Sequence, residues 1–237
     1  MNPARARLLA AFAVAAAAVL AAAAPAGGAN ECDGLMVCVP VAGPWVVVPT
    51  SGAAPRPQVE YQLTCPRGHV VGGLDARLSE RAIDVSFLGR LGSPVNPGIS
   101  TSRSVVFVGA YVGASAQAPT FKPFIGCMPG AGAGSRVPTS ASAFRPGQPT
   151  IRRVRTVRVR PGESTVRQRC RSSERLVGAS HAFGFATRTP PSASLVSGLS
   201  ASESVRGREV AVQVRADAEL ADVRAVVQVH AVCAVTR

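Results

Sequence analysis

Cysteine is the residue type that most constrains the chemistry of this chain. The sequence holds six cysteines, at Cys32, Cys38, Cys65, Cys127, Cys170 and Cys233. An even number is typical of paired cysteines in an oxidising compartment. A metal site is the alternative use of cysteine, but no Cys-x-x-Cys or His-x-x-x-His spacing occurs. We therefore expect three disulfides, no metal site and no cofactor.

A segment bounded by cysteines occurs twice, and this repeat suggests how the cysteines pair. The first copy opens with Cys65-Pro-Arg-Gly-His-Val-Val-Gly-Gly and closes at Cys127. The second opens with Cys170-Arg-Ser-Ser-Glu-Arg-Leu-Val-Gly-Ala and closes at Cys233, and the two intervals differ by one residue. A period this long indicates one folding unit used twice. If the copies fold alike, the disulfides are Cys65–Cys127, Cys170–Cys233 and Cys32–Cys38.

Arginine is the second residue type that could bind a ligand. The formal net charge is +13, and residues 143–237 hold 16 of the 26 basic residues but seven of the 13 acidic ones. When the copies are aligned on their opening cysteines, Arg167 and Arg169 replace Gln62 and Thr64 on the outward face of a predicted strand. Arginine binds phosphate, sulfate and carboxylate groups through paired N–H donors.

These observations predict a polyanion-binding site on the second copy, made of Arg155, Arg158, Arg160, Arg167 and Arg169. Its partner would be an anionic cell-wall or extracellular polymer: a teichoic acid, an acidic polysaccharide, anionic lipid headgroups or DNA. Residues 145–175 contain no aromatic residue to stack on the bases of a single strand, so DNA is the least favoured. A coding bias towards arginine, or the protection of sheet edges by basic side chains, would also account for the arginine excess.

Few other residues are candidates for catalysis. Asp75, Glu80 and Asp84 form the one acidic cluster of the first copy, and a glycoside hydrolase needs two carboxylates on either side of one bond. The second copy places His181 opposite Asp75 and nothing opposite the other two, which favours a solvated loop face. His69, His181 and His230 are isolated from any nucleophile motif, and His230 is expected on the surface of the last strand. We assign no catalytic residue.

The elements that must position these residues are predicted to be β-strands. Val59, Tyr61 and Leu63 alternate with polar residues, and the apolar residues of 223–235 alternate in the same way. Both patterns predict half-buried strands whose inward faces carry the cysteines. Many short valine-rich runs separated by turn residues are typical of antiparallel sheets packed face to face. The predicted fold is all-β, a tandem duplication of a disulfide-closed antiparallel β-sandwich-like unit.

Five segments are expected along the chain. Arg5 and Arg7 precede an apolar run, residues 8–24, which is shorter than the ~20 residues of a membrane span and typical of a cleaved signal. The segments are a signal peptide (1–26), a cysteine-bearing lead-in (27–42), a first β repeat (43–129), a linker rich in Gly, Pro, Ser and Ala (130–149) and a second β repeat (150–237). We expect the mature protein to be secreted and to lack a transmembrane segment.

The opening motif, Cys-Pro-x-Gly-x-x-Val-x-Gly-Gly, and the closing strand with its cysteine resemble a repeat of small, uncharacterised exported proteins of actinobacteria. The resemblance covers the ends of each copy and not the middle. The second copy departs from it, because Arg171 replaces proline, one residue is inserted and Ala179 replaces the second glycine. The resemblance implies export and a disulfide-closed β unit, and it implies no activity and no site.

The sequence therefore predicts a secreted, non-enzymatic binding or structural protein of the cell envelope or extracellular space. It would bind an anionic polymer through the arginine-rich face of the second repeat. Two alternatives remain. One is a secreted hydrolase of wall glycan, and the other is an inhibitor of an extracellular enzyme that uses the turn-rich middle of each repeat as its contact.

Overall fold

The structure, a computed structural model, describes residues 30–50, 56–88, 103–113, 118–130 and 150–235. Within these ranges the protein is nearly all β, with one short helix, α2 (Ala193–Ser197), and one 3-10 turn, η1 (Ala218–Leu220). The predicted all-β antiparallel class is confirmed. No helix of the described part has the length and apolar character of a membrane span. The predicted signal peptide and nearly all of the predicted linker lie outside the described residues.

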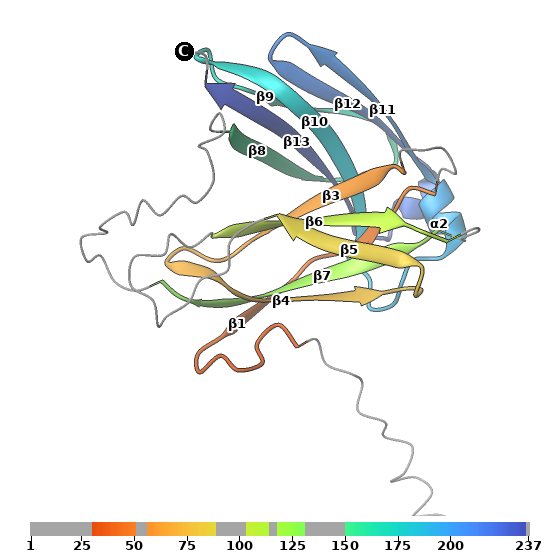
Figure 1. Cartoon of the computed structure of the whole chain (residues 1–237). Coiled ribbons are helices and arrows are strands. Elements are labelled where there is room, and N and C mark those ends of the chain that lie inside the picture. Colours follow the sequence, from red (N-terminus) through yellow and green to blue (C-terminus); the bar gives the residue numbers. More distant parts are fainter. Residues whose placement is uncertain (1–29, 51–55, 89–102, 114–117, 131–149, 236–237) are drawn as a thin grey trace, which may run out of the picture.

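The thirteen strands of the described residues form two parts of the chain, 39–129 and 150–235, which we call the first half and the second half (Figure 1). The strands of the first half are β1 (Val39–Ala42), β2 (Trp45–Val47), β3 (Gln58–Thr64), β4 (His69–Leu78), β5 (Ile83–Leu88), β6 (Ser104–Tyr111) and β7 (Thr120–Pro129). Those of the second half are β8 (Thr150–Arg158), β9 (Gly162–Arg169), β10 (Glu174–Phe185), β11 (Leu199–Arg206), β12 (Glu209–Ala216) and β13 (Ala225–Val235).

The two halves share one order of strand pairing. In the first half β4 pairs with β7, and β3, β6 and β5 form a separate small sheet. In the second half β10 pairs with β13, and β9, β12 and β11 form the small sheet. Strand β2 pairs with both β7 and β10, so β1, β2, β4, β7, β10, β13 and β8 make one continuous large sheet. Each half is thus a small sheet packed on part of a shared large sheet.

Each half has its own apolar core between its two layers. Val59, Tyr61 and Leu63 of β3 are buried in the first core, as their alternation predicts. Val227 and Val229 of β13 are buried in the second core.

Strand β2 belongs to both cores. The indole of Trp45 is buried in the second core, whereas Val46 and Val48 are buried in the first. Successive side chains of a strand point to opposite faces, so this short strand holds the two halves together with both of its faces.

The predicted disulfides are all present. Cys65 is bonded to Cys127 and Cys170 to Cys233, and in both bridges the Cα atoms are 5.7 Å apart. Each of these bridges joins the end of a small-sheet strand to a large-sheet strand and is buried. Cys32 and Cys38 close a local loop. The Cys65–Cys127 and Cys170–Cys233 bridges therefore link the two layers of each half covalently.

The ladders correct the alignment of the two copies. Val71 pairs with Cys127 and Leu176 pairs with Cys233, and directly after them both ladders contain a bulge. Val71 and Leu176 each stand six residues after the opening cysteine, so the inserted residue inferred at the start of the second copy is wrong. By the ladder, Asp75 corresponds to Ser180 and not to His181.

The start of the lead-in, at Asn30 and Glu31, lies on the outer face of the large sheet in the first half, whereas its last residues, 39–42, form β1 of that sheet. The main-chain oxygen of Glu31 would come within 1.9 Å of a Cβ atom at either Gly73 or Gly126. The main-chain N–H of Asn30 donates to the carboxylate of Asp75 at 2.8 Å. The backbone of the lead-in therefore approaches Gly73 so closely that a larger residue would have to displace it.

Candidate anion-binding surface

A polar contact between the halves is centred on Glu60 of β3. Nη1 of Arg152 donates to its Oε2 at 2.5 Å, and Nη2 donates to its Oε1 at 3.2 Å. The Ser180 hydroxyl donates to Oε2 at 2.8 Å. Burial raises the pKa of Glu60, but the hydrogen bonds from Arg152 and Ser180 outweigh it and hold the pKa below its usual value. Glu60 is therefore an ionised and fully engaged carboxylate at neutral pH.

The prediction that His230 lies on the surface is wrong, because its side chain is 0% exposed. Its Nδ1 lies 2.8 Å from Nη1 of Arg152, and its Nε2 lies 2.6 Å from Oε1 of Gln228. A guanidinium only donates and an amide oxygen only accepts, so Nδ1 accepts and Nε2 carries the hydrogen of a neutral ring. Burial and then the charge of Arg152 lower the pKa of His230 to about 4.

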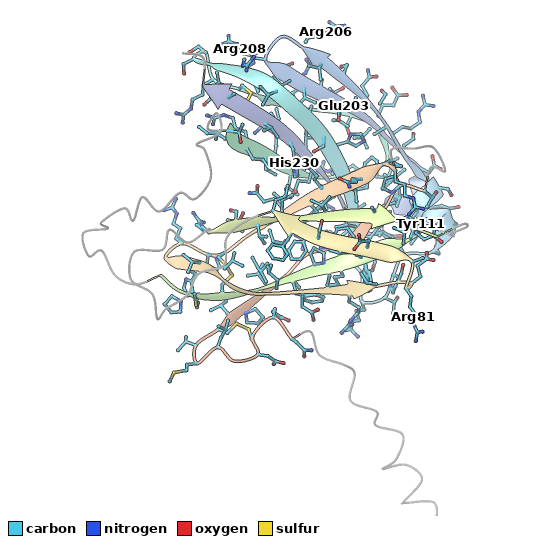
Figure 2. The ribbon with its side chains drawn as sticks, in the orientation of Figure 1. Arg81, Tyr111, Glu203, Arg206, Arg208 and His230 are labelled. Atoms are coloured by element: carbon cyan, nitrogen blue, oxygen red, sulfur yellow. A yellow bond between two sulfur atoms is a disulfide. The ribbon has the colours of Figure 1, made fainter. Side chains whose placement is uncertain are left out.

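Gln228 ties this network to the main chain of the first half. The N–H of Gln62 donates to its Oε1 at 2.6 Å, and its Nε2 donates to the carbonyl oxygen of Gln62 at 3.2 Å. Nε2 also donates to the Thr156 hydroxyl at 3.0 Å. Figure 2 shows His230 where the two halves meet. These side chains are used in packing one half on the other, so we do not assign them to a ligand.

The five arginines predicted to bind a polyanion are all exposed, but they do not form one surface. Arg158 and Arg160 lie at the turn between β8 and β9, whereas Arg167 and Arg169 lie near the other end of β9. That strand has eight residues and spans about 26 Å. Between the two ends, Nη1 of Arg155 donates to the carbonyl oxygen of Arg167 at 3.4 Å.

Arg167 and Arg169 belong instead to a cluster that includes two residues which sequence reasoning missed. Strand β12 places Glu209 between Arg169 of β9 and Arg206 of β11, and Arg208 lies in the hairpin turn between β11 and β12. We call Arg167, Arg169, Arg206, Arg208 and Glu209 the tip cluster. Figure 2 shows Arg206 and Arg208 at the end of the second half that points away from the first.

The tip cluster carries an excess of positive charge. Glu209 accepts from Nη1 of Arg167 at 2.8 Å and from Nη2 of Arg169 at 3.0 Å. These two arginines, Arg167 first, lower the pKa of Glu209. Glu209 is thus the one carboxylate of the tip cluster beside four arginines: it binds Arg167 and Arg169, Arg206 lies opposite it in the ladder, and Nη1 of Arg208 donates to the carbonyl oxygen of Arg171 at 3.1 Å. The Gly207-Arg208 pair inside an alternating run was the sequence signal of a hairpin, because such turns favour glycine at positive φ, here 56°.

Protection of sheet edges accounts for some of the arginines outside the tip cluster. Strand β8 is at one edge of the large sheet and β9 is at one edge of its small sheet. Arg155 and Arg158 of β8 are exposed there, where charged side chains discourage pairing with another chain. Edge protection does not explain the whole tip cluster, because the cluster extends over β9, β12 and β11 and β12 is the central strand of the small sheet.

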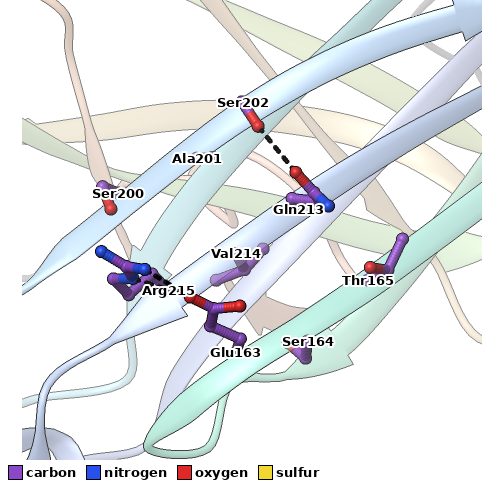
Figure 3. A pocket seen from close by; sticks show the side chains of 9 residues that line it. All are labelled: Glu163, Ser164, Thr165, Ser200, Ala201, Ser202, Gln213, Val214 and Arg215. Atoms are coloured by element: carbon purple, nitrogen blue, oxygen red, sulfur yellow. Dashed lines mark hydrogen bonds and ion pairs between the residues drawn. The ribbon is translucent and has the colours of Figure 1, made fainter.

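A groove lies on the same outer face, and Figure 3 shows the residues that line it. Thr165 of its lining is two residues from Arg167 of the tip cluster along β9. The groove has a volume of about 460 Å³ and crosses β9, β12 and β11. Its polar lining includes Thr165, Ser200 and Ser202 together with Gln213 and the ion pair of Arg215 with Glu163. The Ser202 hydroxyl donates to Oε1 of Gln213 at 3.3 Å.

The acidic cluster of the first half is not brought together as a hydrolase pair. Asp75 points from the outer face of the large sheet and binds the lead-in, whereas Asp84 points from the outer face of the small sheet. Packed sheets are about 10 Å apart, well beyond the ~5 Å of a retaining carboxylate pair. Glu80 accepts a hydrogen bond from the Tyr111 hydroxyl at 3.2 Å.

His69, His181 and the buried cysteines Cys170 and Cys233 do not form an open catalytic or metal site, because each already has a bonded partner. Nδ1 of His181 lies 2.9 Å from Oε2 of Glu203, and this pair joins β10 to β11 across the second core. His69 is hydrogen-bonded to the carbonyl oxygen of Arg67. Cys170, Glu174 and Cys233 lie within 4.8 Å of one another, but both sulfur atoms belong to the disulfide. Glu174 instead pairs with Arg153, which is the main cause of its pKa of about 2.

Comparison with protein-family models, with curated proteins and with solved structures finds no match to this chain. The function is therefore argued from the tip cluster and its surroundings alone.

Proposed function

We propose that this protein is an exported, non-enzymatic binding protein that holds an anionic polymer of the cell envelope or extracellular space. The tip cluster is the contact, in place of the five arginines that the sequence suggested. Three disulfides support an oxidising compartment, where such polymers occur.

The observation that carries the proposal is that Arg206 and Arg169 lie on either side of Glu209, with Arg167 two residues along β9 and Arg208 in the adjoining turn. Glu209 engages two of these guanidinium groups, and within the described residues Arg206 forms no ion pair. A surface of this kind raises the local concentration of a polyanion and binds its charged groups through paired N–H donors.

A duplication of one unit is part of the proposal. Equal pairing order, equal bulges and equivalent disulfides in the two halves support it. In the matched positions Gln62 and Thr64 of the first half correspond to Arg167 and Arg169 of the second. The outer face of this strand meets the second half at Glu60 and Gln62 of the first half, whereas in the second half it is exposed and basic, so there it is open to a ligand.

The test is elution from a dextran sulfate matrix in a salt gradient. The variant carries Arg167→Gln, Arg206→Gln and Arg208→Gln, and the control carries Arg56→Gln, Arg67→Gln and Arg81→Gln at exposed positions of the first half. Both variants lose the same net charge. We expect the tip variant to elute at clearly lower salt than the control, because clustered charges act together. Equal shifts in the two variants would mean that net charge alone governs retention, and the proposal would fail.

A further inference from the structure

We infer that the outer face of the β9–β12–β11 sheet binds an acidic polysaccharide, with sugar hydroxyls in the groove and the anionic groups at the tip cluster. This inference rests on the proposed function and adds the class of the polymer. It comes from the chemistry of the groove, which the charge alone does not explain.

The groove and the tip cluster lie along one face in consecutive rows of the ladder. Glu209 stands between Arg206 and Arg169, and four residues further along β12, Gln213 stands between Ser202 and Thr165. The next row of this face places Arg215 between Ser200 and Glu163. Four residues of a strand span about 13 Å, so a chain lying along β12 contacts both regions at once.

The groove offers both hydrogen-bond donors and acceptors. Thr165, Ser200 and Ser202 supply hydroxyl groups, Gln213 supplies an amide, and Arg215 and Glu163 supply a guanidinium and a carboxylate. The side chains of the last pair are 70% and 71% exposed, so their remaining donors and acceptors face solvent. Each sugar hydroxyl both donates and accepts a hydrogen bond, and the groove supplies acceptors for the first and donors for the second.

The carboxylate of Glu163 separates a glycan from a simple polyanion. A polyphosphate has only acceptor oxygens, so it cannot donate to this carboxylate, whose charge is balanced by the ion pair with Arg215. A sugar hydroxyl donates to the same carboxylate. The groove thus favours the neutral, hydroxylated part of a polymer, while four arginines about 13 Å away favour its charged groups.

The first half shows that these polar residues are not required by the sheet. In the central strand of its small sheet, Val106 and Val108 occupy the positions that Ala211 and Gln213 hold in β12. Both valines are buried. These valines share a face with Glu60 and Gln62, which contact the second half, so the equivalent face is buried in the first half and polar and open to solvent in the second.

The experiment compares the affinities of the protein for three probes: polygalacturonate, linear polyphosphate and neutral dextran, measured by titration calorimetry at one fixed salt concentration. The groove variant is Ser202→Ala with Gln213→Ala, which leaves the tip cluster intact. Gln58→Ala with Ser86→Ala, at exposed positions of the first half, is the control. We expect the groove variant to bind polygalacturonate about fivefold more weakly, since about one hydrogen bond's worth of binding is lost, and to bind polyphosphate unchanged. Unchanged polyphosphate binding also shows that the variant is folded.

The outcomes separate the two proposals. Equal affinity for polygalacturonate and polyphosphate, with no effect of the groove variant, would overturn this inference and leave the proposed function standing. If neither charged polymer binds at physiological salt, both are overturned. Binding of dextran as tight as that of polygalacturonate would show a neutral-glycan site and would overturn the role of the tip cluster.

Discussion

Arg152 and His230, both of the second half, are hydrogen-bonded where the second half meets the first, with Nη1 of the arginine 2.8 Å from Nδ1 of the buried ring. The same Nη1 donates to Glu60 of the first half. A protonated His230 could not accept this hydrogen bond and would place two positive charges side by side. The contact between the halves therefore depends on a neutral histidine.

The first prediction concerns pH. The folded-state pKa of His230, about 4, lies below the ~6.5 of an unfolded chain, so the unfolded chain takes up a proton first as the pH falls. The neutral ring of His230 contributes about 3 kcal/mol to the free energy of unfolding. This contribution is fully present above about pH 6.5 and is lost as the pH falls to about 4. Arg152 strengthens the effect, whereas Glu60 opposes it. Urea unfolding at pH 7 and pH 4 measures the loss.

The non-titrating variant His230→Gln isolates this contribution from the carboxylates, which also titrate in acid. We expect its stability to fall less than that of the wild type over the same pH interval. An equal fall in both proteins would show that His230 does not carry the pH dependence.

The second prediction concerns Glu60. The change Glu60→Gln leaves the partly buried Arg152 without its charge partner, and we expect a loss of about 1–2 kcal/mol in the free energy of unfolding. The matched control is Glu163→Gln, which breaks the exposed pair with Arg215 and should cost no more than about 0.5 kcal/mol. Urea unfolding of both variants at pH 7 tests this, and similar losses in the two would contradict the role of Glu60 in holding the halves together.

The third prediction concerns the contact between the lead-in and the outer face of the large sheet. A methyl group in Gly126→Ala would meet the main-chain oxygen of Glu31 at 1.9 Å, so the lead-in must move away. In Gly178→Ala the new methyl group meets only Val232, at 3.5 Å, and fits. We expect proteolysis around the Cys32–Cys38 loop to become faster in the first variant only. Unchanged cleavage in Gly126→Ala would mean that the lead-in is not held at this place.

The fourth prediction concerns the disulfides. Replacing Cys170 and Cys233 by alanine opens a loop of 63 residues and should cost about 4 kcal/mol in the chain-entropy account. Replacing Cys32 and Cys38 opens a loop of six residues and should cost about 2 kcal/mol. Thermal unfolding of the two double variants gives the order, and a larger loss from the small loop would contradict it.

The alternation of side chains predicted the inward faces well. Val59, Tyr61 and Leu63 and the closing cysteines are buried as expected, because burial between two layers imposes a period of two on a strand. The spacing of the cysteines likewise predicted the bridges, because two units of similar length close at equivalent places.

The outward faces were predicted less well, for a physical reason. Glu60 and His230 do point away from the cores of their own halves, but the two halves cover each other there. Periodicity assigns a side chain to a face and contains no information on what lies against that face. The tip cluster was missed for a similar reason, since Arg206 and Arg169 come into one row of the sheet only after β12 has paired with both neighbours.

The covering of the large sheet by the lead-in has a consequence for assembly. Ser180 of the second half binds Glu60 of the first, and the matched residue Asp75 binds Asn30 of the lead-in. The contact between the halves joins two unlike faces, and contacts of that kind propagate into open fibres when both faces stay free. Here one terminal face is closed by the lead-in and the other presents arginine where the joining strand has Gln62. Among the described residues, the lead-in therefore shields in the first half the face through which the second half makes its contact, and the arginines make the remaining face unlike the one that it meets.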